Sequence, residues 1–283
     1  MGNLIRRLLS CGVALLACAV IVSCQPEVHK QRPYLVLYAF DEEGRVLSES
    51  MSTKETTLIL GRPVTTGELS GKPVVLAESG IGMTNAALTA QRLIDEYDPM
   101  AVVFSGIAGA IDSAVHIGDI VICQEWATHD YVYYGAQGAE PMPISVYHPG
   151  LDSIIRLNSF LVDSVMFVRA RQLPEISIPL ARITERQPRI TVGGIGVSGN
   201  SFIDNVEKRQ WLAREFNATI VDMETAAVAQ VCEINGLPFI GFRSASDLAG
   251  GSGSSTAGEQ LDQFFQVAAN NSAIVVLRFL KSL

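Results

Sequence analysis

TIVDMETAAVAQVCEINGLPFIGF, residues 219–242, decides the predicted fold because it contains a strand, a helix and a second strand in succession. Apolar residues dominate Thr219–Asp222 and Phe239–Phe242, as in buried strands. Between them, Thr225–Asn235 has apolar residues three and four positions apart, which is the spacing of one helix face. Strands that alternate with helices are typical of α/β proteins with a largely parallel sheet covered on both faces.

The same alternation extends through the chain. The further strands that we predict are Tyr34–Phe40, Val74–Glu78, Ala101–Phe104, Gly118–Cys123 and Arg189–Val192, and the further helices are Thr84–Tyr97, Asp204–Phe216 and Glu259–Leu280. Gln137–Gln187 is less regular and is punctuated by proline, so we expect an excursion from the core topology there. No linker-like stretch divides the rest, and the sequence predicts a single α/β domain over residues 34–283.

Composition excludes several classes of protein. The chain has 283 residues, of which 48% are apolar and 18% charged, so it is too apolar for intrinsic disorder. Its 21 Lys and Arg against 29 Asp and Glu give a net charge of −8, so no basic field is available to hold nucleic acid. The four histidines are scattered and no Cys or His cluster is present, so we expect neither a metal nor a cofactor.

Residues 1–23 resemble a secretory signal. Arg6 and Arg7 precede an apolar run, Leu8–Val22, that is too short to span a bilayer comfortably. No later apolar run reaches the length of a transmembrane helix, so we do not expect a membrane-spanning protein.

Cys24 follows two aliphatic residues and a serine, which resembles the lipobox of bacterial lipoproteins. The resemblance implies cleavage before Cys24, a diacylglycerol anchor on its thiol, and a polar tether over residues 24–33. Gln25, instead of Asp, points to an extracytoplasmic protein on the outer membrane. The alternative is an ordinary signal peptide that happens to contain cysteines.

Two glycine clusters lie at the ends of predicted strands. SGIGMTNAA, residues 79–87, opens a helix, so its free amides could hold an anion or a sugar hydroxyl. GIGVSG, residues 194–199, matches the dinucleotide fingerprint G-x-G-x-x-G, and Asp222 follows 23 residues later. However, residues 200–204 separate the last glycine from the next predicted helix, whereas pyrophosphate binding requires the two to adjoin. We therefore do not predict dinucleotide binding.

Five segments in order resemble the purine nucleoside phosphorylase and nucleosidase superfamily, and specifically its methylthioadenosine/S-adenosylhomocysteine nucleosidase branch. They are AFDEE (39–43), SGIGMTNAAL (79–88), FSGIAGAIDSAVHIGDIVI (104–122), VSGNSFI (197–203), and VDMETAAVAQVC (221–232) with FRSASDLAG (242–250). The resemblance runs from about Leu35 to Leu280. It implies a single α/β domain, commonly a homodimer, whose strand ends surround one purine nucleoside.

Three acids carry the chemistry that the resemblance implies. Breaking the bond between ribose C1′ and purine N9 builds positive charge on the sugar and negative charge on the base. By resemblance, Glu43 activates a water, Glu224 holds the ribose hydroxyls, and Asp247 donates a proton to purine N7, which requires a raised pKa. From the residues alone, Glu43 could equally be a solvated side chain, Glu224 an acid that stabilises a helix N-terminus, and Asp247 a residue at which a strand ends.

The resemblance also implies a set of substrate-binding residues. Phe202 and Ile203 would lie beside the base, Met223 would pack on the sugar, and Arg243 would lie near the ribose and Glu224. Phe40, Ile107 and Gly109 complete the predicted set. Ile107 replaces a small hydroxyl residue of the nucleosidases, and the resulting GIAG turn resembles the plant bark and vegetative storage protein branch, whose members need not share the activity.

Three functions remain open at this point. Hydrolysis of a nucleoside such as 5′-methylthioadenosine, S-adenosylhomocysteine or adenosine is favoured, because Arg45 and Arg62 fall outside the family's phosphate positions. The alternatives are a phosphate-dependent phosphorylase and a nucleoside-binding or storage lipoprotein without turnover. The presence of all three acids argues against storage, since binding alone needs no water-activating base.

Overall fold

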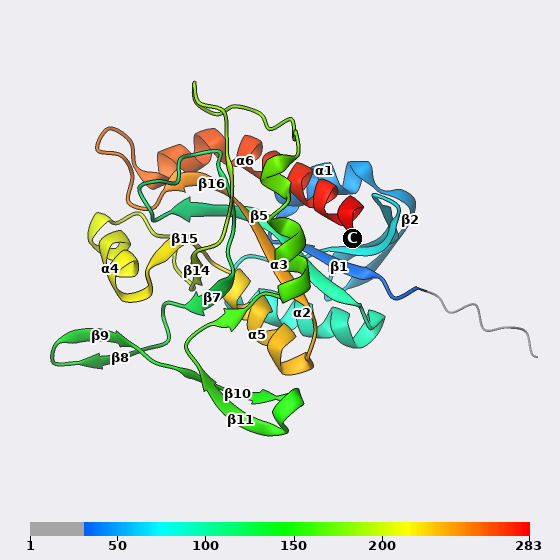
Figure 1. Cartoon of the computed structure of the whole chain (residues 1–283), viewed down its shortest axis with the longest axis horizontal. Helices are drawn as coiled ribbons and strands as arrows, with labels where there is room; N and C mark the ends of the chain where they lie inside the picture. The colour runs from blue at the N-terminus through cyan, green and yellow to red at the C-terminus, as the bar shows by residue number, and fades with distance from the viewer. Residues whose placement is uncertain (1–30) are drawn as a thin grey trace, which may run out of the picture. The chain divides into compact units, whose positions relative to one another are not determined.

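A computed structural model describes residues 31–283, in which Arg32–Leu283 form one compact unit (Figure 1). The signal segment and Cys24 lie outside the described residues. The helices are α1 (Asp41–Ser50), α2 (Met83–Tyr97), α3 (Ser164–Ala170), α4 (Val206–Phe216), α5 (Thr225–Asn235) and α6 (Ala257–Ser282). None of these helices is both long enough and apolar enough to cross a membrane.

Twelve strands form one mixed sheet. They are β1 (Tyr34–Tyr38), β2 (Ser52–Ile59), β3 (Arg62–Leu69), β4 (Lys72–Glu78), β5 (Ala101–Ala110), β6 (Ile120–Ile122), β7 (Glu125–Thr128), β12 (Phe160–Leu161), β13 (Ile190–Val192), β14 (Ile195–Ser198), β15 (Ala218–Asp222) and β16 (Phe239–Leu248). The main path runs β12-β7-β14-β15-β5-β1-β4-β3-β2, and β16 pairs with β5 and β6. The central pairs are parallel, except that β15 runs antiparallel to β5. The predicted α/β fold with a mixed, largely parallel sheet is confirmed.

The centre of the sheet is buried on both faces. All five residues of β1 are buried, and Leu35, Val36 and Leu37 are fully inaccessible. Each such side chain stabilises the fold by about 1.5–3 kcal/mol relative to an exposed position. β1 therefore reads as a continuous apolar run, as expected for a central parallel strand.

Helices cover the two faces of this sheet. On one side α6 packs on β5 and β16 and against α1, and on the other α2 packs against α5 (Figure 1). α6 begins with a capping box, in which the Thr256 hydroxyl accepts the Glu259 amide proton and the Glu259 carboxylate accepts that of Thr256. α5 ends at Asn235 and is capped by Gly236, whose φ of +63° lies in the left-handed region that glycine adopts without strain.

Several local predictions are corrected by the structure. GIAG, residues 106–109, is part of β5 and not a turn, because β5 and β16 continue as paired strands well past Phe104 and Phe242. Residues 195–198 of the second glycine cluster are themselves strand β14, and the turn is made earlier, at Gly193 and Gly194. The β2–β3 hairpin was missed because β2 is almost wholly exposed and carries no alternating apolar pattern.

The irregular segment over residues 137–187 holds short elements of its own. It completes hairpin β8 (Val132–Gly135)–β9 (Gly138–Pro141), contains hairpin β10 (Ile144–His148)–β11 (Ser153–Leu157), and continues through β12 and α3. Figure 1 shows the two hairpins projecting from the sheet. The predicted excursion from the core topology is confirmed.

Candidate functional site

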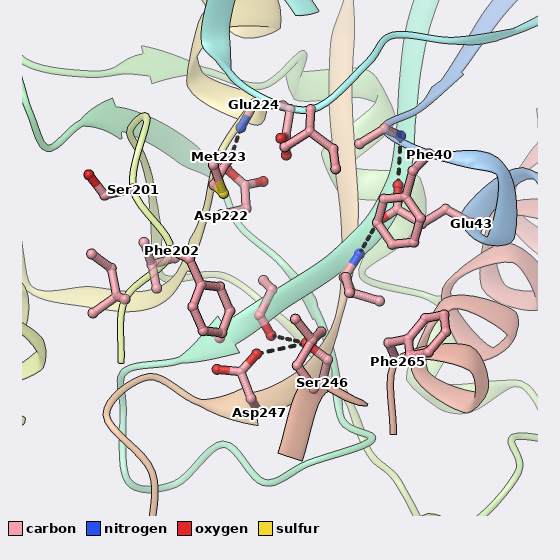
Figure 2. Close-up of a pocket in the computed structure, with 18 of the residues that line it drawn as sticks. Phe40, Glu43, Ser201, Phe202, Asp222, Met223, Glu224, Ser246, Asp247 and Phe265 are labelled. Carbon is pink, nitrogen blue, oxygen red and sulfur yellow. Dashed lines mark hydrogen bonds between the residues drawn. The ribbon is translucent and has the colours of Figure 1, made fainter. Parts of the chain in front are cut away.

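A cavity of about 280 Å³ lies where several strands and helices end (Figure 2). Its lining comes from the β1–α1 junction, the start of α2, β5, the loop after β14, the β15–α5 junction, β16 and α6. We call it the main cavity; the residues that line it are Ala39, Phe40, Glu43, Ile81, Ile107, Ala108, Gly109, Ser201, Phe202, Ile203, Val221, Asp222, Met223, Glu224, Ser246, Asp247, Leu261, Asp262 and Phe265. Nine of the ten site residues predicted from the sequence are in this set, and Arg243 is the exception.

Glu43 lies in the first turn of α1 and is 2% exposed. Its neighbours Asp41 and Glu42 face solvent, so the helix turns one acid of AFDEE inward. Two backbone amides hold the carboxylate: Ala39 N–H donates to Oε2 at 2.6 Å, and Ile107 N–H donates to Oε1 at 2.8 Å. Burial nevertheless raises the pKa of Glu43 to about 7, so the group can accept a proton near neutral pH.

Glu224 precedes α5 and points toward the start of α2. Gly82 N–H donates to its Oε1 at 2.8 Å. Burial, and next the negative charge of Asp222, raise the pKa of Glu224 to about 8. Glu224 lines the cavity, and no hydrogen bond to its second oxygen, Oε2, is found among the described residues, so this oxygen is available to bind hydroxyl groups.

Asp247 reaches the cavity through an irregularity in β16. Ala245 pairs with Ala108 and Asp247 with Gly109, so Ser246 is an extra residue in the pairing of β16 with β5. Adjacent residues of a regular strand point to opposite faces, whereas this bulge lets Ser246 and Asp247 both line the cavity.

The two oxygens of Asp247 have different surroundings. The Ser246 hydroxyl donates to Oδ2 at 2.8 Å, and Oδ1 is buried without a partner among the described residues. A Cβ on Gly109 would lie 2.9 Å from Oδ1, so glycine leaves room for the carboxyl group. Burial raises the pKa of Asp247 to about 6. This acid can therefore carry a proton that it offers to a bound ligand.

Arg243 lies behind the cavity wall and is 1% exposed. Its Nε pairs with Asp222 Oδ2 at 2.8 Å, and its guanidinium carbon lies 4.2 Å from the centre of the Phe104 ring. Nη1 is 3.8 Å from Glu43 Oε1 and has no hydrogen-bond partner in the described part of the chain. A Cβ on Gly106 would collide with Nη1, so glycine permits this approach. The sequence-based prediction placed Arg243 near Glu224, and the charge of Arg243 does lower the pKa of Glu224. The ion-pair partners that the structure gives Arg243 are Asp222 and Glu43.

The other predicted residues form the walls. Phe202 is 46% exposed at the rim, and Ile203 is buried. Ile107 contacts Glu43 through its backbone amide, a contact that does not depend on its side chain. Between residues 31 and 283, no group of three or more His, Cys, Asp or Glu side chains is placed to hold a metal ion.

With this geometry established, comparison with known proteins identifies the family. The model of the phosphorylase superfamily matches residues 33–281. The chain belongs to the phosphorylase superfamily. This superfamily member is 33% identical over 249 residues to a protein of Tolumonas auensis named 5′-methylthioadenosine/S-adenosylhomocysteine nucleosidase, with 88% of this chain and 98% of that protein aligned.

Two solved structures are similar to this superfamily member over most of its length. The Neisseria meningitidis 5′-methylthioadenosine/S-adenosylhomocysteine nucleosidase, in complex with methylthio-immucillin-A, is similar with a TM-score of 0.73 and 30% identity, over 89% of this chain and 100% of that one. The futalosine hydrolase of Helicobacter pylori is similar with a TM-score of 0.74 and 25% identity, over 89% and 98% of the two chains. The predicted resemblance to the nucleosidase branch is confirmed.

Sequence reasoning missed part of the site of this superfamily member. Asp222 was noted only within a rejected dinucleotide motif, yet it lines the cavity and pairs with Arg243. Leu261, Asp262 and Phe265 line the cavity from the first turns of α6. No signal in the sequence distinguishes them from an ordinary amphipathic helix face, whereas the acidic pair of the segment VDME could have drawn attention to Asp222.

Proposed function

We propose that the chain hydrolyses the N-glycosidic bond of a purine nucleoside and releases the free base and the ribose part. The observation that carries this proposal is that Glu43, Glu224 and Asp247, from three separate parts of the chain, border one cavity and all have raised pKa values (Figure 2). Binding alone would not require three buried acids, because burying a carboxyl group costs free energy.

The reaction assigns a separate role to each acid. Water attacks C1′ as the bond from C1′ to N9 breaks, and Glu43 takes the proton that the water loses. Asp247 gives its proton to N7, so the base departs as a neutral molecule. Glu224 binds the ribose hydroxyls and, when ionised, stabilises positive charge on the sugar. The unpartnered Nη1 of Arg243 lies behind the cavity wall, 3.8 Å from Glu43 Oε1, where its positive charge favours the ionised form of Glu43 that accepts the proton.

The lining of the cavity favours hydrolysis over phosphorolysis. No lysine or arginine belongs to the set of described residues that line it. Arg62 lies next to Gly80, but it forms an ion pair with Glu78, so its charge is neutralised. A phosphate ion would therefore meet carboxylates without a matching cation.

The walls suggest the class of 5′ substituent. Phe40, Ile81, Leu261 and Phe265 give the cavity an apolar side. An apolar group such as methylthio fits this side, in keeping with the names of the relatives, and a 5′-phosphate would be repelled by the surrounding acids. We propose 5′-methylthioadenosine, S-adenosylhomocysteine or an adenosine-like nucleoside as the substrate.

Release of the free purine base decides between the candidate functions. Purified protein is incubated with methylthioadenosine, S-adenosylhomocysteine, adenosine and inosine, with and without phosphate, and the free base is quantified by chromatography. We expect the base to appear equally in both conditions. Release that depends on phosphate would support a phosphorylase, and binding without release would support a storage protein.

We further propose that the protein is a homodimer anchored by lipid on Cys24 on the outer membrane. Exposed Tyr131, Tyr133 and Tyr134, of which Tyr134 is 80% exposed, give the region of β8 a surface suited to a second copy of the chain. Light scattering after size exclusion measures the number of subunits. Mass spectrometry of the N-terminal peptide detects acylation, and an unmodified peptide beginning after a different residue would support an ordinary signal peptide.

A further inference from the structure

Asp222, the last residue of β15, has both carboxylate oxygens occupied by protein donors. Oδ1 accepts hydrogen bonds from the Ser198 hydroxyl and from the backbone N–H groups of Glu224 and Thr225. Oδ2 accepts the Thr225 hydroxyl and pairs with Nε of Arg243. These donors use the lone pairs that a carboxylate offers. Asp222 is therefore a poor candidate for contacting a substrate, although it borders the main cavity.

The same contacts fix the orientation of Arg243. Its Nε and Nη2 both donate to the Thr225 hydroxyl, at 2.9 and 2.6 Å, and the face of the guanidinium lies on the Phe104 ring. A guanidinium is a rigid planar fork, so holding one edge determines where the remaining nitrogen points. That nitrogen is Nη1, which is unpartnered and lies beside Glu43.

We propose that Asp222 is a positioning residue for the hydrolysis: it locks one edge of the Arg243 guanidinium and so aims Nη1 at the carboxylate of Glu43, which takes the proton of the attacking water. This inference rests on the proposed function. Without its carboxylate partner, Arg243 could rotate or leave its buried position, and Nη1 would lose its direction.

The first test compares turnover in three variants. Asp222→Asn keeps the shape of the side chain but cannot accept from all of these donors, and we expect kcat to fall by about 30-fold with a smaller change in KM. Asp222→Glu retains the charge and should recover most of the loss. Asp152→Asn, on the exposed turn between β10 and β11, is the matched control for an Asp to Asn change. A kcat of Asp222→Asn equal to that of the control overturns the proposal.

A double-mutant cycle with Arg243→Lys separates positioning from a structural role. Lysine keeps the positive charge but has no fork to aim. If Asp222 acts through Arg243, Asp222→Asn should lower kcat by less than about threefold in the Arg243→Lys background. A loss that is equally large in both backgrounds would mean that Asp222 only supports the fold, and it would overturn the proposal.

A readout that needs no activity distinguishes failure of this inference from failure of the proposed function. In ¹⁵N-arginine-labelled protein, a locked Arg243 gives separate, slowly exchanging Nη signals, and Asp222→Asn should merge them. If Asp222→Asn does not fold, Thr225→Val takes its place, because it removes the hydroxyl that bridges Asp222 and Arg243 and should merge the Arg243 signals in the same way. Unchanged Arg243 signals in a folded variant would overturn the inference. If the unaltered protein releases no base but the Arg243 signals merge in Asp222→Asn, the proposed hydrolysis is overturned and the positioning of Arg243 by Asp222 is not.

Discussion

The hydrogen bond from Ser246 to Asp247 sets the pH at which the proposed acid holds its proton. The Ser246 hydroxyl donates to Asp247 Oδ2 at 2.8 Å, and this bond lowers the pKa of Asp247 against the larger effect of burial, which raises it to about 6. A hydrogen bond to an ionised group contributes about 1.5–3 kcal/mol, and 1.4 kcal/mol corresponds to one pKa unit. Ser246→Ala should therefore raise the pKa of Asp247 to about 7 or above.

The direction of the effect on activity follows from the roles of the two acids. Turnover requires protonated Asp247 and ionised Glu43, whose pKa is about 7. Because the base has the higher pKa, the active form is a minor species: at low pH the rate follows the fraction of ionised Glu43, which Ser246→Ala leaves unaltered, and at high pH it follows the fraction of protonated Asp247, which the change increases. With the pKa of Asp247 changed from about 6 to about 7, the ratio of mutant to unaltered kcat/KM rises by about eightfold between pH 5 and pH 8.

The assay is initial-rate adenine release at subsaturating methylthioadenosine in a constant-ionic-strength buffer series. The ratio of the two profiles cancels any uniform loss caused by looser packing of Asp247. Ser244→Ala, at a buried serine of the same strand that does not line the cavity, is the matched control. A ratio that stays flat or falls with pH would refute the assignment of Asp247 as the proton donor.

Three more predictions test the other groups of the site. Glu43→Gln should lower kcat by about 10²- to 10⁴-fold while thermal-shift titration shows that ligand binding persists; full turnover would exclude Glu43 as the base. Burial raises the pKa of Glu224 from 4.5 to about 8 in the folded protein, so its contribution to stability is fully present below pH 4.5 and is lost as the pH rises from 4.5 to about 8. Urea unfolding should therefore show that Glu224→Gln gains stability relative to the unaltered protein between about pH 5 and pH 8, and a constant difference in unfolding free energy over this range would contradict this. Phe202→Ala should raise KM by about tenfold if the ring stacks on the base, and an unchanged KM would remove Phe202 from the base subsite.

The spacing of apolar residues predicts the core of this fold well, because the burial of apolar side chains is what determines which positions lie in the core. The predicted helix Thr225–Asn235 agrees with α5 at both ends, since a glycine follows it and apolar spacing defines its face. β5 and β16 were predicted too short, because their second halves contain glycines, serines and charged residues. Those residues are present because the strands end at the cavity. There, glycines let neighbouring side chains come close to the backbone, and polar side chains take the place of apolar packing.

The candidate site was much less accessible to reasoning from residue types. Glu43 is one of three consecutive acids, and nothing but the resemblance distinguished it from its exposed neighbours. The bulge at Ser246 depends on pairing with a strand more than a hundred residues earlier in the chain, so no local signal predicts it. Likewise, the pairing of Arg243 with Asp222 is decided by which strands are neighbours, and sequence order does not give this.

The apolar character of the cavity explains why one site can hold a base and an acid with similar pKa values. Burial raises the pKa values of both Glu43 and Asp247, so two groups that are both ionised in water become partly protonated near neutral pH. The catalytic form, with Glu43 ionised and Asp247 protonated, is then a minor species whose abundance the surrounding donors control. Two amides and Arg243 favour the ionised form of Glu43, whereas Asp247 has one hydroxyl donor and a bare Oδ1. These donors narrow the difference between the two acids, although the pKa of Glu43, about 7, still lies above that of Asp247, about 6. β5 needs glycine at 106 and 109 because side chains there would displace Arg243 and Asp247, and with them the donors and the room that set this balance.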